Sequence, residues 1–311
     1  LEIADIGIPQ SVIDSQDLST ILIQSSCALK LLPERPRDGH KGLFGRVLVI
    51  AGSVGLTGAS AMASLSALRV GAGLVTLGTP ESLNPIMEVK LTEAMTLPLP
   101  ETSHQTLSIR AYDKIMQMVN GTDVVAIGPG LSRNPETMEL VRKLCKGINI
   151  PKVIDADGLN ALAEDKNCLS ELGKQTVLTP HPGEMARLIG KTISDVQSDR
   201  INIAIDFAKE YGVILVLKGV PTVIAEPNGE AYLNTTGNPG MASGGTGDVL
   251  TGTIAGFLAQ GLDAKNSAIL GVYVHGLAGD LASIDKGEAG LIAGDLIDFL
   301  PKAIKKVISN Q

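Results

Sequence analysis

The sequence has no tryptophan, four phenylalanines, four tyrosines and three cysteines among its 311 residues. Cys27, Cys145 and Cys168 are scattered and lack CxxC spacing, so neither a disulfide scaffold nor a structural zinc site is supported. This cysteine usage fits a reducing compartment, and we expect the protein in the cytoplasm.

Clustered positive charge and long apolar runs are also absent. The formal net charge is −7 and no lysine/arginine cluster stands out, which argues against nucleic-acid binding. No apolar run approaches the length needed to cross a bilayer, and the N-terminus lacks a basic region followed by an apolar core. We therefore expect no membrane association.

What the sequence does contain, from residue 46 onward, is an alternation of short aliphatic runs with longer helical segments. This alternation is typical of a parallel sheet covered on both faces, and 44% hydrophobic residues suffice for the core of one large α/β domain. Strands are predicted at Arg46–Ala51, Gly73–Gly78, Asp123–Ile127, Lys152–Asp155, Thr176–Thr179 and Val213–Leu217. A hairpin, Val220–Ala225 and Glu230–Leu233 around Asn228-Gly229, and helices at Gly244–Gln260, Ala264–Ser283 and 290–309 follow.

Glycines and polar residues follow most of these strands. Because ligands bind beyond the carboxyl ends of parallel strands, the loops predict one shared crevice. The loops are Gly52–Gly58, Gly128–Gly130, Asp155–Gly158, Pro180–Glu184 and Lys218–Thr222.

The most informative segment is the run Asn238–Asp248, directly before an apolar helix. Glycines at a helix start expose backbone N–H groups to an anion such as phosphate. The Asp248 carboxylate would repel that anion unless it takes a proton from an attacking hydroxyl, and the alternative is that it caps the helix.

Two further glycine segments have two interpretations each. Gly52–Gly58 precedes a predicted helix but lacks GxGxxG spacing and an acid after the next strand, which disfavours a dinucleotide-binding dehydrogenase. Its small residues serve either a flat ligand or helix packing. Gly128-Pro-Gly130 either leaves room for a ligand or is a turn.

Acids, a histidine and a lysine complete the candidate residues. His181 and Glu184 lack a third zinc ligand nearby, so Glu184 is better suited to magnesium through water or to the helix dipole. Asp155 and Asp157 alternate and would point the same way in an extended chain, unless Asp157 caps a helix. Lys218 either lines a nucleotide site or extends to solvent.

Taken in order, these motifs resemble the ADP/ATP-dependent NAD(P)H-hydrate dehydratases of the ribokinase-like superfamily. The motifs are His40–Gly42 with Arg46–Ser53, Thr57–Gly73, Gly128–Gly130, Asp155–Asp157, Pro180–Glu184 and Gly244–Asp248. The resemblance implies a three-layer α/β/α fold with a mostly parallel central sheet over residues 33–311. Residues 1–32 would be an extension or the junction after an epimerase domain, which is itself absent.

The resemblance also implies a role for each site residue. Ala59, Gly130, His181 and Asp248 would bind hydrated NADH or NADPH. The adenosine nucleotide would contact Lys218, Gly219, Val220, Pro221, Thr222 and Gly247. Asp248 with Gly245 and Gly247 would catalyse phosphorylation of the hydrated ring, after which phosphate leaves, and Glu184 would reach Mg²⁺ through water.

We expect ADP as the phosphoryl donor, because Lys218–Thr222 resembles the bacterial and archaeal type, with ATP as the alternative. The family resemblance implies a homotetramer. A small-alcohol kinase of the same superfamily, acting on hydroxyethylthiazole or hydroxymethylpyrimidine, is the nearest competing function. A nucleotide sensor without turnover is disfavoured, because a sensor has no use for Asp248 as a base.

Overall fold

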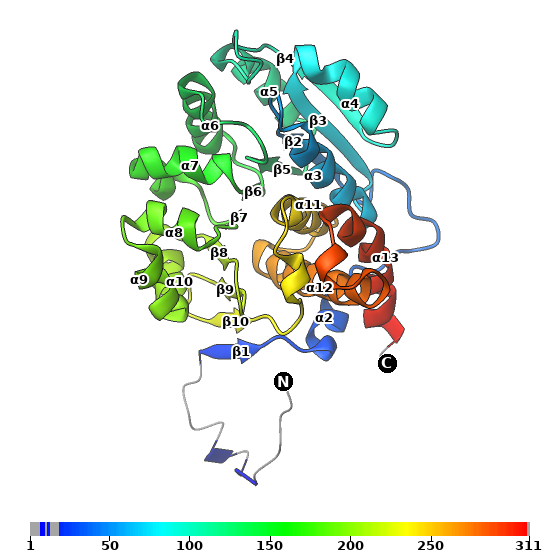
Figure 1. Cartoon of the computed structure of the whole chain (residues 1–311), viewed down its shortest axis with the longest axis vertical. Helices are drawn as coiled ribbons and strands as arrows, with labels where there is room; N and C mark the ends of the chain where they lie inside the picture. The colour runs from blue at the N-terminus through cyan, green and yellow to red at the C-terminus, as the bar shows by residue number, and fades with distance from the viewer. Residues whose placement is uncertain (1–6, 10, 13–18, 310–311) are drawn as a thin grey trace.

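A ten-stranded sheet forms the centre of the protein (Figure 1). The computed structural model describes residues 7–9, 11–12 and 19–309. The strands are β1 (Thr20–Leu22), β2 (Arg46–Ile50), β3 (Leu74–Pro80), β4 (Met95–Leu99), β5 (Val124–Ile127), β6 (Lys152–Ile154), β7 (Thr176–Leu178), β8 (Ile214–Leu217), β9 (Val223–Ala225) and β10 (Ala231–Leu233). Their order across the sheet is β1-β10-β9-β8-β7-β6-β5-β2-β3-β4.

Strands β2 to β8 all run parallel to one another, and β9 is antiparallel to both β8 and β10. The predicted mostly parallel sheet is thus confirmed, as are its strands to within two residues at either end and the hairpin between β9 and β10. The sequence did not predict the edge strands β1 and β4. Proline interrupts the aliphatic pattern of β4 at Pro98, and β1 is only three residues long.

Helices cover both faces of the sheet. They are α2 (Ser25–Leu31), α3 (Thr57–Arg69), α4 (Asn84–Lys90), α5 (Tyr112–Val119), α6 (Pro135–Gly147), α7 (Asp157–Glu164), α8 (Pro182–Ile189), α9 (Ile193–Ser198), α10 (Arg200–Tyr211), α11 (Thr246–Ala259), α12 (Ala264–Lys286) and α13 (Ala293–Ser309). Figure 1 shows α3, α11, α12 and α13 on one side and α6, α7, α8 and α10 on the other. The expected three-layer α/β/α architecture is confirmed.

Strand β2 shows why the sheet must be covered twice. Val47 and Val49 pack into the core beneath α3 and α11, whereas Leu48 and Ile50 pack into the core beneath α5 and α6. All four side chains are buried, because alternate residues of a strand point to opposite faces. A continuous aliphatic run is the pattern of such a doubly covered strand.

Helix α12 corrects the expectation that no apolar run reaches bilayer length. By length and composition Ala264–Lys286 could span a membrane, but 72% of its apolar window is buried inside the protein. A central helix of a large α/β core passes the same test, so this helix is weak evidence for a membrane segment.

Residues 20–31 belong to the same fold as the rest of the chain. Strand β1 pairs with β10, with Thr20 opposite Ala231, and Ala28 of α2 is buried in the core shared with α12 and α13. The interpretation of residues 1–32 as an extension or junction remains a prediction, and residues 1–6, 10 and 13–18 lie outside the described part of the chain.

Candidate active site

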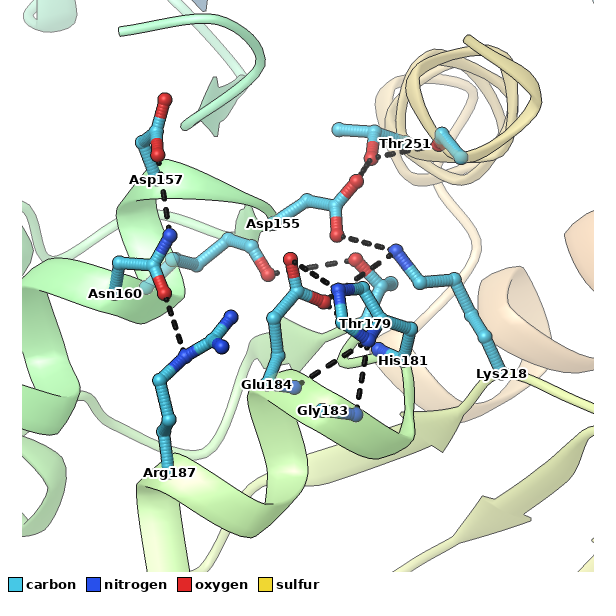
Figure 2. Close-up of polar contacts among 12 residues, drawn as sticks. Asp155, Asp157, Asn160, Thr179, His181, Gly183, Glu184, Arg187, Lys218 and Thr251 are labelled. Carbon is cyan, nitrogen blue, oxygen red and sulfur yellow. Dashed lines mark hydrogen bonds and ion pairs between the residues drawn. The ribbon is translucent and has the colours of Figure 1, made fainter. Parts of the chain in front are cut away.

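The loops after β6 and β8 meet through a buried ion pair, as a shared crevice requires. Lys218 Nζ donates to Asp155 Oδ1 at 2.8 Å, and Thr251 of α11 donates its hydroxyl to Asp155 Oδ2 at 2.7 Å (Figure 2). Asp155 is 1% exposed, so its carboxylate is held on both oxygens away from water. The predicted convergence of strand ends is therefore confirmed for these two loops.

Lys218 does not extend to solvent, which was one of its two interpretations. Its ammonium also lies 3.8 Å from Glu184 Oε2, and its side chain is 19% exposed. Burial alone would lower the pKa of Lys218, but the charges of Asp155 and Glu184 outweigh burial and hold the pKa above its ordinary value. Lys218 therefore stays charged beside Asp155 and Glu184, at the carboxyl ends of the strands.

Asp248 lies in the first turn of α11, at the edge of this charged cluster. Burial raises its pKa to about 7, the charge of Asp155 adds to the shift, and Lys218 opposes it. The N-cap position is occupied by Gly245, at φ 95°, and no side chain caps this helix. The capping interpretation of Asp248 is therefore not supported, and a carboxylate with this pKa is suited to accept a proton near neutrality.

Gly247, in the first turn of α11, lies directly against the ion pair of Asp155 and Lys218. A Cβ placed on Gly247 would lie 3.2 Å from Lys218 Nζ and 3.8 Å from Asp155 Oδ2. The first distance is tighter than an ordinary contact, so any side chain at position 247 would push the Lys218 ammonium away by a few tenths of an ångström. The first N–H groups of α11 have no intrahelical partner, so they are available to donate to an anion.

His275 of α12 supports the glycine run from behind, and sequence reasoning missed it. Its Nε2 lies 2.9 Å from the carbonyl oxygen of Thr246, so this nitrogen carries the proton and donates. Burial lowers the pKa of His275 to about 4, which keeps the ring neutral. A histidine in an apolar helix is usually an ordinary buried residue, and the sequence has no signal that distinguishes His275 from such a residue.

His181 and Glu184 form a reciprocal cap at the start of α8. His181 Nδ1 accepts from the N–H of Gly183, at 2.9 Å, and Glu184 Oε2 accepts from the N–H of His181, at 2.8 Å (Figure 2). The Glu184 side chain is 7% exposed and burial raises its pKa, whereas the His181 side chain is 51% exposed. The helix-start interpretation of Glu184 is confirmed, and the ring of His181 remains open to a ligand.

Gly130 and Ala59 lie against each other, as two residues of one ligand site should. A Cβ on Gly130 would come within 2.9 Å of Leu56 and 3.1 Å of the Ala59 Cβ, and Gly130 has φ 62°. Ser53 donates its hydroxyl to the Gly130 carbonyl at 2.8 Å, which joins the two glycine loops. Close loop packing thus already requires the glycine, and ligand contact by Gly130 and Ala59 stays a prediction.

Of the two interpretations of Asp155 and Asp157, the shared direction was wrong, and capping by Asp157 is not supported either, because Ala156 occupies the N-cap position of α7 and no side chain caps this helix. Ala156 between them has φ 49°, so the chain turns rather than extends. Asp157 instead accepts from the N–H of Ser132 and from Asn160 Nδ2, at 2.8 and 3.1 Å. Its carboxylate therefore holds the loop after Gly130, away from the ion pair.

Within the described ranges, no group of three or more His, Cys, Asp or Glu side chains could hold a metal ion. A zinc site at His181 and Glu184 is accordingly not supported. A magnesium ion that keeps waters and phosphate oxygens as ligands needs only one or two carboxylates, and buried Glu184 fits that requirement.

Comparisons with known proteins agree on one family. The family model for NAD(P)H-hydrate dehydratase matches residues 47–302. The bifunctional NAD(P)H-hydrate repair enzyme Nnr of Moorella thermoacetica is 50% identical over 99% of this chain, which covers 58% of that relative. The chain thus spans somewhat more than half the length of such bifunctional relatives.

Shorter relatives match along nearly their whole length. The ADP-dependent (S)-NAD(P)H-hydrate dehydratase of Bacillus subtilis is 36% identical over 88% of this chain and 94% of its own. The crystal structure of an ADP/ATP-dependent NAD(P)H-hydrate dehydratase from B. subtilis, co-crystallised with ATP and Mg²⁺, superposes with a TM-score of 0.77. It shares 31% identity over 92% of this chain and 98% of that chain.

Proposed function

The chain belongs to the NAD(P)H-hydrate dehydratase family, and on that premise we propose that it is an ADP-dependent (S)-NAD(P)H-hydrate dehydratase. It would phosphorylate the hydroxyl of hydrated NADH or NADPH and release phosphate to restore the reduced cofactor. The proposal covers the reaction of this chain, and the activities of longer bifunctional relatives are a separate matter.

The observation that carries the proposal is the position of Asp248. Its carboxylate lies at a glycine-rich helix start, where an anion would bind, and its pKa of about 7 matches that of a base working near neutrality. The carboxylate would take the proton of the ring hydroxyl as that oxygen attacks phosphorus. Lys218, held beside Gly247, keeps the pKa of Asp248 from rising further.

The start of α11 supplies the other half of the chemistry. Its free N–H groups, from Gly245 and Gly247 among others, would donate to the oxygens of the transferred phosphoryl group as negative charge develops there. His275 holds the Thr246 carbonyl from behind and fixes the direction of these donors. Because they are fixed before the reaction, they need no reorganisation during it.

Magnesium, when bound, would neutralise the oxygens of the donor phosphates, as it does in phosphoryl transfer generally. Glu184 would hold it through water, because a magnesium ion that keeps its waters and phosphate oxygens needs only one or two carboxylates, and this buried carboxylate is fixed by the His181 N–H. His181, through its exposed ring, would bind the hydrated nucleotide together with Ala59 and Gly130.

The reaction balances without further reagents. The hydroxyl oxygen forms a bond to the terminal phosphorus of ADP, the bond to AMP breaks, and the hydroxyl proton passes to Asp248. The ring nitrogen then expels phosphate with its lone pair, which leaves a cationic iminium, and loss of a proton from the neighbouring ring carbon to water restores the double bond of the reduced nicotinamide. Because phosphate is a good leaving group, the second step needs little from the protein.

Recovery of the reduced-nicotinamide absorbance tests the proposal. Purified protein is mixed with NADH hydrate and Mg²⁺ in parallel samples with ADP, ATP or no nucleotide. Recovery with ADP supports the proposal, and recovery with ATP alone overturns the choice of donor while keeping the reaction. No recovery in a folded protein that phosphorylates hydroxyethylthiazole or hydroxymethylpyrimidine would replace the dehydratase with a small-alcohol kinase.

The remaining parts of the proposal rest on resemblance and composition. We propose a homotetramer, an epimerase domain upstream in the full-length protein, and a cytoplasmic location consistent with three unpaired cysteines. Sedimentation and the sequence of the complete gene product test the first two.

A further inference from the structure

Arg200, the first residue of α10, is a half-buried arginine that pairs with no carboxylate in the described part of the chain. The ion pairs within 4.0 Å do not include it, and burial lowers its pKa. A positive charge in the first turn of a helix also opposes the helix dipole. Burial and the helix dipole both disfavour the positive charge of Arg200, so we expect a specific interaction that compensates for them.

Its partner is the main chain around Lys218–Thr222. Arg200 Nη2 lies 3.1 Å from the carbonyl oxygen of Leu217, 3.2 Å from that of Lys218 and 2.9 Å from that of Pro221. Gln197 fixes the guanidinium by accepting from Nη1 at 2.7 Å. Nη2 of one guanidinium thus contacts three backbone carbonyl oxygens of one loop.

Because Arg200 fixes the direction of these carbonyl groups, it also fixes the direction of the N–H groups that follow them in the chain. In a trans peptide the C=O and N–H groups point in opposite directions, so the N–H groups of Gly219 and Thr222 point away from Arg200. Among residues 19–309, neither N–H donates to an acceptor of the protein. By contrast, the N–H of Lys218 donates to the Pro180 carbonyl, which anchors the loop to the end of β7.

We propose that Arg200 is the positioning residue of the phosphoryl-donor site, which directs the Gly219 and Thr222 N–H groups at the nucleotide. This inference rests on the proposed function. Gly219 supports it, because a Cβ there would come within 2.7 and 2.8 Å of the two terminal guanidinium nitrogens, and its φ of +145° suits glycine. The ligand class is the anionic phosphate chain of an adenosine nucleotide, held by amides polarised from behind.

Binding and kinetics of Arg200→Lys test the inference, with the exposed Arg37→Lys as the matched control. Lysine keeps the charge but lacks the planar fork, in which Nη1 is fixed by Gln197 while Nη2 faces the three carbonyls. We expect the Kd and KM for ADP to rise at least about tenfold, because the variant loses the hydrogen bonds that orient the loop. The KM for the hydrate and kcat should change less than about twofold. Thermal unfolding checks that both variants fold.

Chemical rescue separates this role from a general structural one. In Arg200→Ala, millimolar guanidinium should restore ADP affinity, whereas urea at equal concentration, neutral and of similar shape, should restore less. Wild-type protein that binds neither ADP nor ATP overturns the donor site and this inference together. Wild-type binding that persists unchanged in Arg200→Lys, or a loss that falls equally on ADP and hydrate, overturns the inference alone.

Discussion

Asp155 and Lys218 are 63 positions apart in the sequence, and their side chains meet at 2.8 Å beneath the start of α11. Asp155 comes from the end of β6 and Lys218 from the end of β8, so parallel strands bring them together. Thr251, one turn after Asp248 on α11, holds the other oxygen of Asp155. The ion pair thereby fixes the helix that carries the proposed base.

Asp248→Asn should abolish turnover and stabilise the protein above neutral pH. Loss of a positioned base costs about 10²–10⁴-fold in rate. The folded pKa of about 7 lies above the ordinary 3.8, so burying the ionised carboxylate destabilises the fold as pH rises through that range. Removing it should add roughly 1–4 kcal/mol of stability at pH 8 and almost nothing at pH 4.

Denaturant titrations at both pH values measure this stability difference, with Asp206→Asn at an exposed position of α10 as the control. Full turnover by Asp248→Asn, or a stability gain that does not depend on pH, would contradict the role and environment assigned to Asp248.

The pH dependence of kcat/KM should shift in opposite directions when the ion pair is altered. For the wild type we expect a rise with a midpoint near pH 7, as Asp248 ionises. Asp155→Asn should move the midpoint to lower pH, because the charge of Asp155 raises the pKa of Asp248. Lys218→Met should move it to higher pH, because the ammonium lowers that pKa.

Initial rates at low substrate across pH 5–9 check these shifts, a range set by the usual titration window of a group with a pKa near neutrality. Shifts of both variants in the same direction would contradict the opposite effects that Asp155 and Lys218 have on the pKa of Asp248.

Gly247→Ala should reduce turnover while leaving the protein folded. Its new methyl group would lie 3.2 Å from Lys218 Nζ, at the place where the helix start meets the ion pair. We expect at least about a tenfold loss in kcat/KM, the scale of one displaced oxyanion donor or less. Gly290→Ala is the matched control, because a Cβ there meets nothing within 4 Å. Equal activities of the two variants would remove Gly247 from the site.

His275 should make the protein less stable as pH falls from about 6.5 to about 4. The unfolded chain takes up a proton at this histidine below its ordinary pKa of 6.5, whereas the buried ring stays neutral down to about 4. His275→Gln should lack this contribution, so its stability relative to wild type should improve by up to about 1.4 kcal/mol per pH unit across that window. His104→Gln, at an exposed position, is the control for urea unfolding at each pH. A pH-independent difference would contradict the burial of a neutral ring.

The sequence predicted the parts of the site that follow strands. Aliphatic runs such as Val213–Leu217 predict a buried strand. A polar residue directly after such a strand, such as Lys218, must lie at the carboxyl edge of the parallel sheet. Helical residues were harder to assign. Thr251, His275 and Arg200 each stand in a helical pattern, where a hydroxyl, a histidine or an arginine reads as ordinary core or surface.

The backbone conformation of Ala156 explains why the predicted common direction of Asp155 and Asp157 was wrong. The alternation of Asp155 and Asp157 suggested one shared direction, but the positive φ of Ala156 turns the chain between them. Nothing in the type of residue 156 announces that turn, since alanine rarely adopts this conformation.

Turnover of NADH hydrate followed together with AMP and phosphate release tests the central claim most directly. With ADP and Mg²⁺, wild-type protein should form NADH, AMP and phosphate in equal amounts, and Asp248→Asn should form none of them at a comparable rate. Recovery of NADH without AMP release, or undiminished release of all three by Asp248→Asn, would contradict phosphorylation of the hydrate with Asp248 as its base.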